Sequence, residues 1–326
     1  MRAREIHLLQ RPDGLPQQHN FAVAEVETPD VSDGEVQVQA LLLSVDPYMR
    51  PRLDADQLLN TPLVGRGIGR IVKSRNPQFR EGDLVRHSAG MREHFNSSVE
   101  GLQLLTAAPD LPLSVYMHAL GSTGLTAYGG LLAIGALQKG EQVFVSTAAG
   151  AVGSVAAQIA KINHCYVVGS TGSPEKAAWL SDEAKLDAVI NYRKGVLAEE
   201  LEAVTPNGID VYFENVGGKH LDAALPRMNV RGRIPVCGMI ATYNGGGDPV
   251  ENLFKLIYGR LRMEGFVSTD FAHLRAAFEA DMTKWLKAGQ MKYQETILDG
   301  FERVPEALIG LFEGRNSGKM LVRVAS

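Results

Sequence analysis

The feature of this sequence that most restricts its fold is a run of strand-like, turn-like and helix-like residues that follow one another directly. The apolar segment Gln142–Thr147 is followed by the small residues Ala148–Gly153 and then by the helix-like segment Ser154–Lys161. At such a turn, the exposed amides and the positive end of the helix favour an anionic group, and small residues let the backbone approach it closely. We therefore predict a βαβ unit whose turn holds the pyrophosphate of a dinucleotide, with Gly153 letting the helix pack closely on the sheet.

From this point onward, strand-like and helix-like segments alternate, which is typical of a parallel sheet with helical crossovers. The predicted strands are Gln142–Thr147, Tyr166–Ser170, Ala188–Asn191, Asp210–Glu214, Arg233–Cys237 and Met263–Val267. The helices predicted between them include Val152–Ile162, Pro174–Leu180 and His220–Met228. Six such strands with their helices match a whole doubly wound α/β dinucleotide-binding fold.

The sequence on both sides of this region has a β-rich pattern. Short strand candidates separated by turns run from residue 21 to about residue 106, and they indicate a partly open barrel. They include Val36–Val45, Gly67–Lys73 and Asp83–His87. The tail is expected to form a helix at Ala272–Ala288, a strand at Tyr293–Leu298, a helix at Val304–Phe312 and a closing strand at Lys319–Val324.

We expect this tail to return to the first domain, so that the cofactor domain is an insertion. The β-rich domain then comprises residues 1–117 and 290–326, and the α/β domain comprises residues 118–289. Ligand sites commonly lie at such a junction.

The composition excludes several other classes of protein. The chain of 326 residues has a net charge of −4, so no global field favours nucleic acid or an anionic membrane. No apolar run approaches the ~20 residues of a membrane-spanning helix, and the first residues lack the apolar core of a signal peptide. We therefore expect a soluble protein of the cytoplasm.

Cysteine and histidine usage argues against a metal site and against disulfides. The two cysteines, Cys165 and Cys237, rule out a disulfide framework and a four-cysteine zinc site, and they fit a reducing compartment. His87 and His94 come closest to a pair of metal ligands, but we expect both to be surface residues. No metal is predicted.

The end of the second α/β strand predicts the choice of cofactor. NAD-binding folds of this kind place a carboxylate there to accept hydrogen bonds from the ribose, whereas Ser170–Lys176 offers hydroxyls and a lysine. Such donors suit the 2′-phosphate of NADP(H), with Ser173 and Lys176 as its ligands. Tyr192 and Arg193 follow the third strand and bring a phenol and a guanidinium nearby, although both could instead be surface residues.

Several segments together resemble the medium-chain dehydrogenase/reductase superfamily. They are Ser44–Arg50, Gly124–Tyr128, Ser146–Gly153, Glu214–Gly218, Cys237–Asn244 and Asn316–Met320. The resemblance extends over nearly the whole chain. Within the superfamily, the chain resembles more narrowly the zinc-independent branch of prostaglandin reductases, leukotriene 12-hydroxydehydrogenases, plant alkenal double-bond reductases and bacterial curcumin reductases. Asp46–Arg50 is the most specific segment, because it replaces the zinc-ligand region of the alcohol dehydrogenases. The resemblance implies a Rossmann domain inserted into a GroES-like barrel domain, and a homodimer.

The resemblance also implies roles for individual residues. Lys176 and Tyr192 match residues that hold the 2′-phosphate, and Tyr243 is expected to reach the nicotinamide ribose. The catalytic candidates are Tyr48, Tyr243 and Tyr258; Tyr48 and Tyr258 match substrate-pocket tyrosines, and the alternative is that they pack between the domains. The expected cofactor-binding residues are Thr126, Ala149, Gly150, Ala151, Val152, Gly153, Ser173, Lys176, Tyr192, Asn215, Cys237, Tyr243, Phe266, Val267 and Asn316.

These residues point to NADPH-dependent reduction of the carbon–carbon double bond of α,β-unsaturated aldehydes or ketones. Hydride addition to the β-carbon puts negative charge on the carbonyl oxygen, and each donor aimed at that oxygen lowers the barrier by roughly 3–4 kcal/mol. The α-carbon then takes its proton from solvent by default. The alternatives are an NADPH:quinone reductase of the same superfamily and a non-catalytic NADPH-binding redox sensor.

The sequence departs from the family in places that commonly line the substrate cleft. Leu63–Gly69 and the turn at Gly121–Gly124 differ from the common forms, and residues 52–62 and 245–250 are short. The identity of the substrate therefore stays open.

Overall fold

The computed structural model describes residues 1–325, which divide into two compact units. The first, the β-rich unit, consists of Met1–Met117, Glu295–Asn316 and the residues from Met320 onward. The second, the α/β unit, consists of His118–Gln294 and Ser317–Lys319. The predicted fold class, a Rossmann domain inserted into a β-rich domain, is confirmed.

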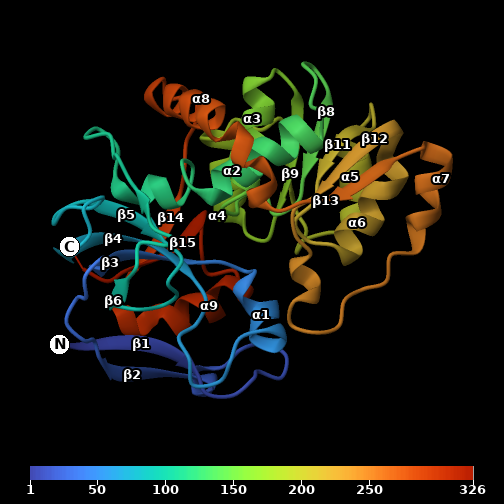
Figure 1. Cartoon of the computed structure of the whole chain (residues 1–326). Helices are drawn as coiled ribbons and strands as arrows, with labels where there is room; N and C mark the ends of the chain where they lie inside the picture. Colours follow the sequence, from blue (N-terminus) through green and yellow to red (C-terminus); the bar gives the residue numbers. More distant parts are fainter. Residues whose placement is uncertain (326) are drawn as a thin grey trace. The chain divides into compact units, whose positions relative to one another are not determined.

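The β-rich unit contains a seven-stranded sheet and a separate two-stranded sheet (Figure 1). The larger sheet has the order β14-β15-β3-β4-β5-β7, and β6 pairs with β3. Its strands are β3 (Val36–Val45), β4 (Arg66–Ser74), β5 (Leu84–His87), β6 (His94–Ser97), β7 (Gln103–Leu104), β14 (Glu295–Asp299) and β15 (Lys319–Arg323). The smaller sheet pairs β1 (Arg2–Leu8) with β2 (Phe21–Glu27). Antiparallel pairing of β15 with β3 places the end of the chain beside one of the first strands.

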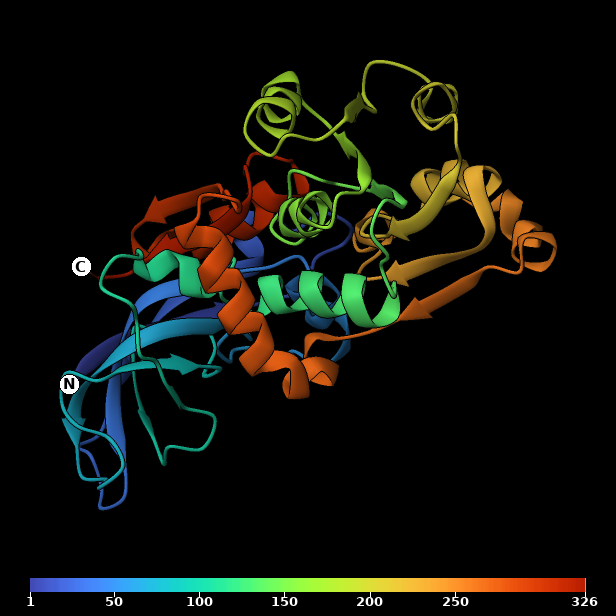
Figure 2. The same ribbon diagram turned by 90° about the horizontal axis from the view of Figure 1, so that it is seen from above.

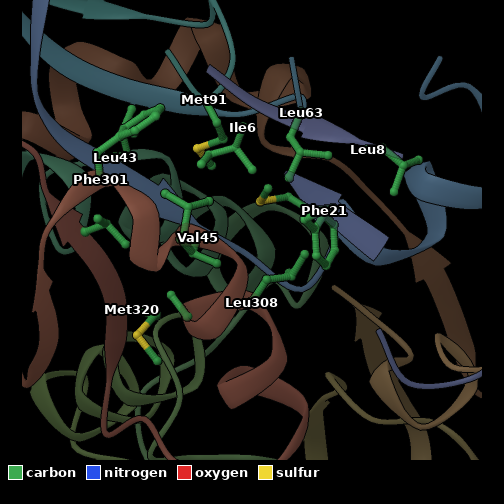
Figure 3. Close-up of a cluster of buried hydrophobic side chains, with 14 of the residues drawn as sticks. Ile6, Leu8, Phe21, Leu43, Val45, Leu63, Met91, Phe301, Leu308 and Met320 are labelled. Carbon is green, nitrogen blue, oxygen red and sulfur yellow. The ribbon is translucent and has the colours of Figure 1, made fainter. Parts of the chain in front are cut away.

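The core of the β-rich unit lies between these strands and helix α9 (Val304–Phe312), as Figure 3 shows. Leu43 and Val45 of β3 pack with Ile6 of β1 and with Phe301 and Leu308 of the tail. All five side chains are at most 1% exposed. Burying a side chain of this size stabilises the fold by roughly 1.5–3 kcal/mol, so the tail contributes directly to the stability of the unit.

The α/β unit is built on six parallel strands in the order β10-β9-β8-β11-β12-β13. The strands are β8 (Gln142–Val145), β9 (Tyr166–Thr171), β10 (Ala188–Asn191), β11 (Ile209–Phe213), β12 (Met228–Val236) and β13 (Arg262–Gly265). The chain begins in the middle at β8, runs out to β10 and returns to β11, so the strand order reverses between β8 and β11. In α/β sheets, ligands bind at the carboxyl ends of the strands at this switch point.

Helices lie on both sides of this sheet, as the view from above shows (Figure 2). They are α2 (Ser122–Gly129), α3 (Gly153–Ile162), α4 (Pro174–Asp182), α5 (Leu197–Val204), α6 (Gly218–Ala224), α7 (Lys255–Gly259) and α8 (Arg275–Lys287). Between sheet and helices, Phe144 of β8 stacks on Tyr212 of β11 with ring centroids 4.8 Å apart. No helix in residues 1–325 is long and apolar enough to cross a membrane.

Two helix predictions and one turn prediction are wrong in detail. The helix expected at His220–Met228 ends at Ala224, and Met228 already begins β12. A 3-10 turn at Leu225–Arg227 follows instead, and Pro226 within it has no N–H with which to continue the α-helical hydrogen bonds. The expected turn at Gly121–Gly124 is instead the start of α2, and the helix expected at Ala272–Ala288 begins only at Arg275, after a 3-10 segment.

Two elements of the β-rich unit were not predicted. β1 buries Ala3, Ile6 and Leu8 but carries charged residues between them, so its period-2 pattern is irregular. Helix α1 (Met49–Ala55) lies partly within the Asp46–Arg50 motif and buries Met49 and Leu53. In both segments, only contacts with distant residues decide the conformation.

The expectation that His87 is a surface residue is wrong. Alternation along β5 turns His87 inward with Val85, and the imidazole is 3% exposed. Its ring packs on Phe95 with centroids 4.9 Å apart. Burial lowers the pKa of His87 to about 4, so the ring is neutral at physiological pH.

Candidate active site

The predicted phosphate-binding turn follows β8 at the switch point of the α/β sheet. Thr147 has a φ of 50°, in the left-handed region that side chains with a Cβ rarely adopt. Ala148 N–H donates to the Ser170 carbonyl at 2.8 Å, and Gly150 N–H donates to the Thr147 carbonyl at 2.9 Å. The turn is therefore tied both to the neighbouring strand β9 and to itself, which holds its remaining amides in place.

Gly153 is required where α3 begins. A Cβ atom at this position would lie 2.4 Å from the Thr147 carbonyl oxygen and 3.0 Å from the Ala148 Cα, so no larger residue fits. The N-cap residue of α3, Val152, makes no side-chain hydrogen bond to the start of the helix, which leaves the positive end available to an anion. The turn at Ala148–Gly153 therefore fits the pyrophosphate of a dinucleotide.

A buried polar network joins the ends of β8 and β11 beside this turn. Ser146 Oγ donates to Glu214 Oε1 at 2.9 Å and accepts from Asn215 N–H at 2.9 Å. Asn215 Nδ2 donates to the Ser146 carbonyl at 2.7 Å, and Val216 N–H donates to Glu214 Oε1 at 2.6 Å. Burial raises the pKa of the Glu214 carboxyl, and the hydrogen bond from Val216 opposes this shift. The network fixes Asn215, one of the predicted cofactor ligands, at the switch point.

Cys237 and Tyr243 follow β12 next to the same network. Cys237 N–H donates to the Glu214 carbonyl at 2.8 Å, and Met239 N–H donates to Tyr243 Oη at 3.3 Å. Burial and the charge of Glu214 raise the pKa of the Cys237 thiol to about 12, so the thiol stays protonated. Burial also raises the pKa of Tyr243, whose hydroxyl stays protonated.

A second cluster of predicted ligands lies where β9 and β10 end. Ser173 Oγ accepts from Lys176 N–H at 3.3 Å, so Ser173 caps α4. Burial and the positive charge of Arg193 lower the pKa of Lys176, whereas Glu175 acts in the opposite sense. Two cations that repel each other are stabilised by an anion between them, which fits a phosphate group.

Phe266, Val267 and Thr126 are three further predicted cofactor-binding residues of the α/β unit. Phe266 follows β13 and packs against the rings of Phe213 and Phe271 at 6.2 and 5.4 Å. Val267 is 60% exposed. Thr126 Oγ1 donates to the Ser122 carbonyl within α2 at 2.8 Å.

The remaining predicted residues are distributed over both units. Tyr48 lies in the β-rich unit at the start of α1, and burial together with the charge of Asp46 raises its pKa to about 12. Tyr258 lies on α7 in the α/β unit and is 77% exposed. Asn316 belongs to the β-rich unit, whereas Gly318, two residues on, donates its N–H to the Ala149 carbonyl within the α/β unit.

Sequence reasoning assigned no role to three residues of this site. Ser146 and Glu214 were noted only as parts of motifs, and His118, whose Nε2 lies 3.0 Å from the Ala151 carbonyl oxygen, was not noted. An acidic residue at the end of a buried strand was the available signal for Glu214, because a buried carboxyl group needs hydrogen-bond partners. Within residues 1–325, no group of three or more His, Cys, Asp or Glu side chains could hold a metal ion.

Comparison with known proteins gives matches along nearly the whole chain. The profile of a family described as "N-terminal domain of oxidoreductase" matches residues 4–105, and one described as "Zinc-binding dehydrogenase" matches residues 151–288. A 2-alkenal reductase (NADP(+)-dependent) of Nicotiana tabacum is 42% identical, covering 96% of this chain and 94% of that protein. Prostaglandin reductase 1 of Rattus norvegicus is 42% identical over 95% and 96% of the two chains. The crystal structure of CurA from Vibrio vulnificus in complex with NADPH has a TM-score of 0.94 and 38% identity, covering 99% and 100%.

Proposed function

Because the chain belongs to the zinc-independent branch of the medium-chain dehydrogenase/reductase superfamily, we propose that it reduces the carbon–carbon double bond of α,β-unsaturated aldehydes and ketones with NADPH. The observation that carries this proposal is the end-to-end similarity to a protein named 2-alkenal reductase (NADP(+)-dependent). The similarity to a structure solved with NADPH supports the choice of cofactor.

The geometry of the α/β unit supports the same cofactor. The turn at Ala148–Gly153 and the open end of α3 would bind the pyrophosphate, and Asn215 would lie beside the dinucleotide. Lys176, Tyr192 and Arg193 would hold the 2′-phosphate. When bound, NADPH would supply the hydride that is added to the β-carbon of the substrate.

The protein's own part in this reaction is to position the substrate and to stabilise charge on the carbonyl oxygen. We assign the donor role to the phenol of Tyr48 or Tyr258, to a ribose hydroxyl that Tyr243 orients, or to a backbone amide. The raised pKa values of Tyr48 and Tyr243 keep both phenols protonated. No buried acid is assigned to the α-carbon, which takes its proton from solvent. Residues 1–117 with 290–326 would form the substrate domain, and residues 118–289 the cofactor domain.

We further propose a homodimer formed through the α/β units. β13 is an edge strand, and all four of its residues are exposed. Beside it in sequence, Ile257 of α7 is 72% exposed and Phe254 is 51% exposed. An exposed sheet edge next to apolar side chains is typical of an interface, here with a second copy of this chain. A cytoplasmic location is consistent with two unpaired cysteines.

The proposed activity is tested by following NADPH oxidation with a panel of enones, enals, quinones and saturated ketones, repeated with NADH and with a chelator. We expect turnover of enones and enals, a preference for NADPH, and no effect of the chelator. Turnover confined to quinones would instead support a quinone reductase. Binding of NADPH without turnover of any acceptor would support a redox sensor.

A further inference from the structure

His220 is a buried residue of α6 to which neither the family resemblance nor the proposed mechanism gives a role. Its imidazole packs against the ring of Tyr192, with centroids 4.9 Å apart and ring planes at 80°. Tyr192 directly follows β10, whereas His220 comes 28 positions later, after the whole of α5 and β11. The contact therefore joins the segments that follow β10 and β11, which are successive strands along the chain.

In this contact, His220 acts as an aromatic ring and not as a hydrogen-bonding or charged group. The side chain is 6% exposed, and its Nε2 atom is buried with no hydrogen-bond partner in the described part of the chain. Burial lowers the pKa of His220 to about 4, so the ring is neutral at physiological pH. A planar ring held perpendicular to a second ring is a favoured aromatic arrangement.

The hydroxyl end of Tyr192 lies against Gly172, directly after β9. A Cβ atom on Gly172 would lie 2.7 Å from Tyr192 Oη and 3.2 Å from Arg193 Nε, so the absence of a side chain makes room for both groups. Gly172 immediately precedes Ser173, the cap of α4, and Lys176 lies in the first turn of that helix. The phenol therefore reaches the same strand end as the two cations.

We infer that His220 is a positioning residue for recognition of the 2′-phosphate, because its ring holds the phenol of Tyr192 beside Lys176 and Arg193. This role rests on the proposed use of NADPH. His220 touches Tyr192 and acts only through it. Removal of the ring frees the Tyr192 side chain, so that binding of the 2′-phosphate first has to order it. The pyrophosphate turn is unaffected, since it is tied to β9 and to itself.

The inference is tested by calorimetric titration with 2′,5′-ADP and with 5′-AMP, which differ only in the 2′-phosphate. We expect His220→Ala to weaken binding of 2′,5′-ADP about three- to ten-fold and to leave binding of 5′-AMP unchanged. His220→Phe keeps a ring at this position and is expected to restore binding to within about twofold. We also expect the ratio of kcat/KM with NADPH to kcat/KM with NADH, measured with one enone, to fall in His220→Ala and to recover in His220→Phe.

Leu221→Ala serves as the matched control, because Leu221 is a buried neighbour on α6 that belongs to the hydrophobic core. It should lower Tm without changing the ratio of the two affinities. Equal weakening of both nucleotides by His220→Ala, or no weakening, would overturn the role of His220. A wild-type protein that does not distinguish 2′,5′-ADP from 5′-AMP would contradict the NADPH premise itself, and the role of His220 with it.

Discussion

At the scale of single residues, we expect the charge of Lys176 to determine how strongly the 2′-phosphate is bound. Hydrogen bonds to charged groups contribute about 1.5–3 kcal/mol, so Lys176→Ala should raise the Kd of NADPH roughly 10- to 100-fold. The Kd of NADH should change by less than about twofold, since NADH has no 2′-phosphate. Fluorescence titration measures both values. Lys139→Ala, which removes an exposed lysine of the same unit, is the control, and an equal loss for both cofactors would contradict this assignment.

Tyr48 is expected to act as a hydrogen-bond donor to the substrate oxygen. Its pKa of about 12 keeps the phenol protonated, so its ionisation should cause no loss of rate between pH 7 and 10. Tyr48→Phe removes the donor and should lower kcat about 10²- to 10³-fold, with a smaller change in KM. Steady-state kinetics with one enone measures both effects. Full activity of Tyr48→Phe would exclude the role.

Residues whose function depends on the local backbone were accessible from the sequence, whereas those that depend on distant contacts were not. The turn at Ala148–Gly153 was predicted from the order of strand-like, small and helix-like residues. In the structure, Gly153 lies so close to the backbone of Thr147 that only a glycine fits. Glu214 and His220 are defined by partners on other strands and helices, to which the sequence pattern gives no direct access. The burial of His87 also follows from the packing of β5 and not from local sequence.

The close approach of α3 to the end of β8 is the critical contact at the scale of secondary-structure elements. Gly153→Ala would force a Cβ atom to within 2.4 Å of the Thr147 carbonyl oxygen, so the turn must shift. Overpacking of this kind costs about 1–3 kcal/mol, and we expect a lower Tm and weaker binding of NADPH and NADH alike. Gly310→Ala is the control, because its added Cβ would meet only ordinary contacts at 3.7–3.8 Å. Unchanged affinity for both cofactors in Gly153→Ala would show that the turn does not bind them.

Burial of His87 on β5 makes the stability of the fold sensitive to acid. The folded-state pKa of about 4 lies below the ordinary value of 6.5, so the unfolded chain binds the proton first as the pH falls. Stability is therefore full above about pH 6.5 and is lost between pH 6.5 and 4, by roughly 3 kcal/mol at most for this residue. His87→Phe should flatten the dependence in urea unfolding measured across this range. An equally steep dependence in the variant would contradict this origin.

Most strands of the α/β unit, and several helices of both units, were predictable because each has a strong pattern of its own. Ala188–Asn191 and Val304–Phe312 coincide with β10 and α9, and the other predicted strands of the sheet overlap their observed counterparts. The errors arise where a local pattern competes with another signal. Helix α6 gives way early to a 3-10 turn that contains Pro226, which has no N–H to donate. Helix α2 begins within a glycine-rich segment that resembles a turn.

Association of two chains through β13 and α7 is the prediction at the scale of the whole molecule. Ile257→Asp places a charge on a 72% exposed apolar position and should convert the dimer into a monomer. Light scattering after size exclusion measures the change from the mass of two chains to that of one. Val196→Asp alters an equally apolar position, 58% exposed, before α5 and should leave the dimer intact. A monomeric wild-type protein would refute the proposal.

The family and fold class follow from the whole chain and are confirmed, whereas the substrate depends on segments where this sequence departs from its relatives. The short segments at residues 52–62 and 245–250 are such places. Cofactor recognition uses backbone turns and a few charges, which a sequence displays directly. Substrate choice depends on the shape of a cleft.

The central claim, reduction of the carbon–carbon double bond, is tested most directly by identifying the product formed with NADPH deuterated at the transferred position. The reaction is run with 4-phenyl-3-buten-2-one, and the product is analysed by NMR. We predict the saturated ketone, with deuterium on the β-carbon and a solvent-derived proton on the α-carbon. The allylic alcohol, with deuterium on the carbonyl carbon, would contradict the proposed reaction.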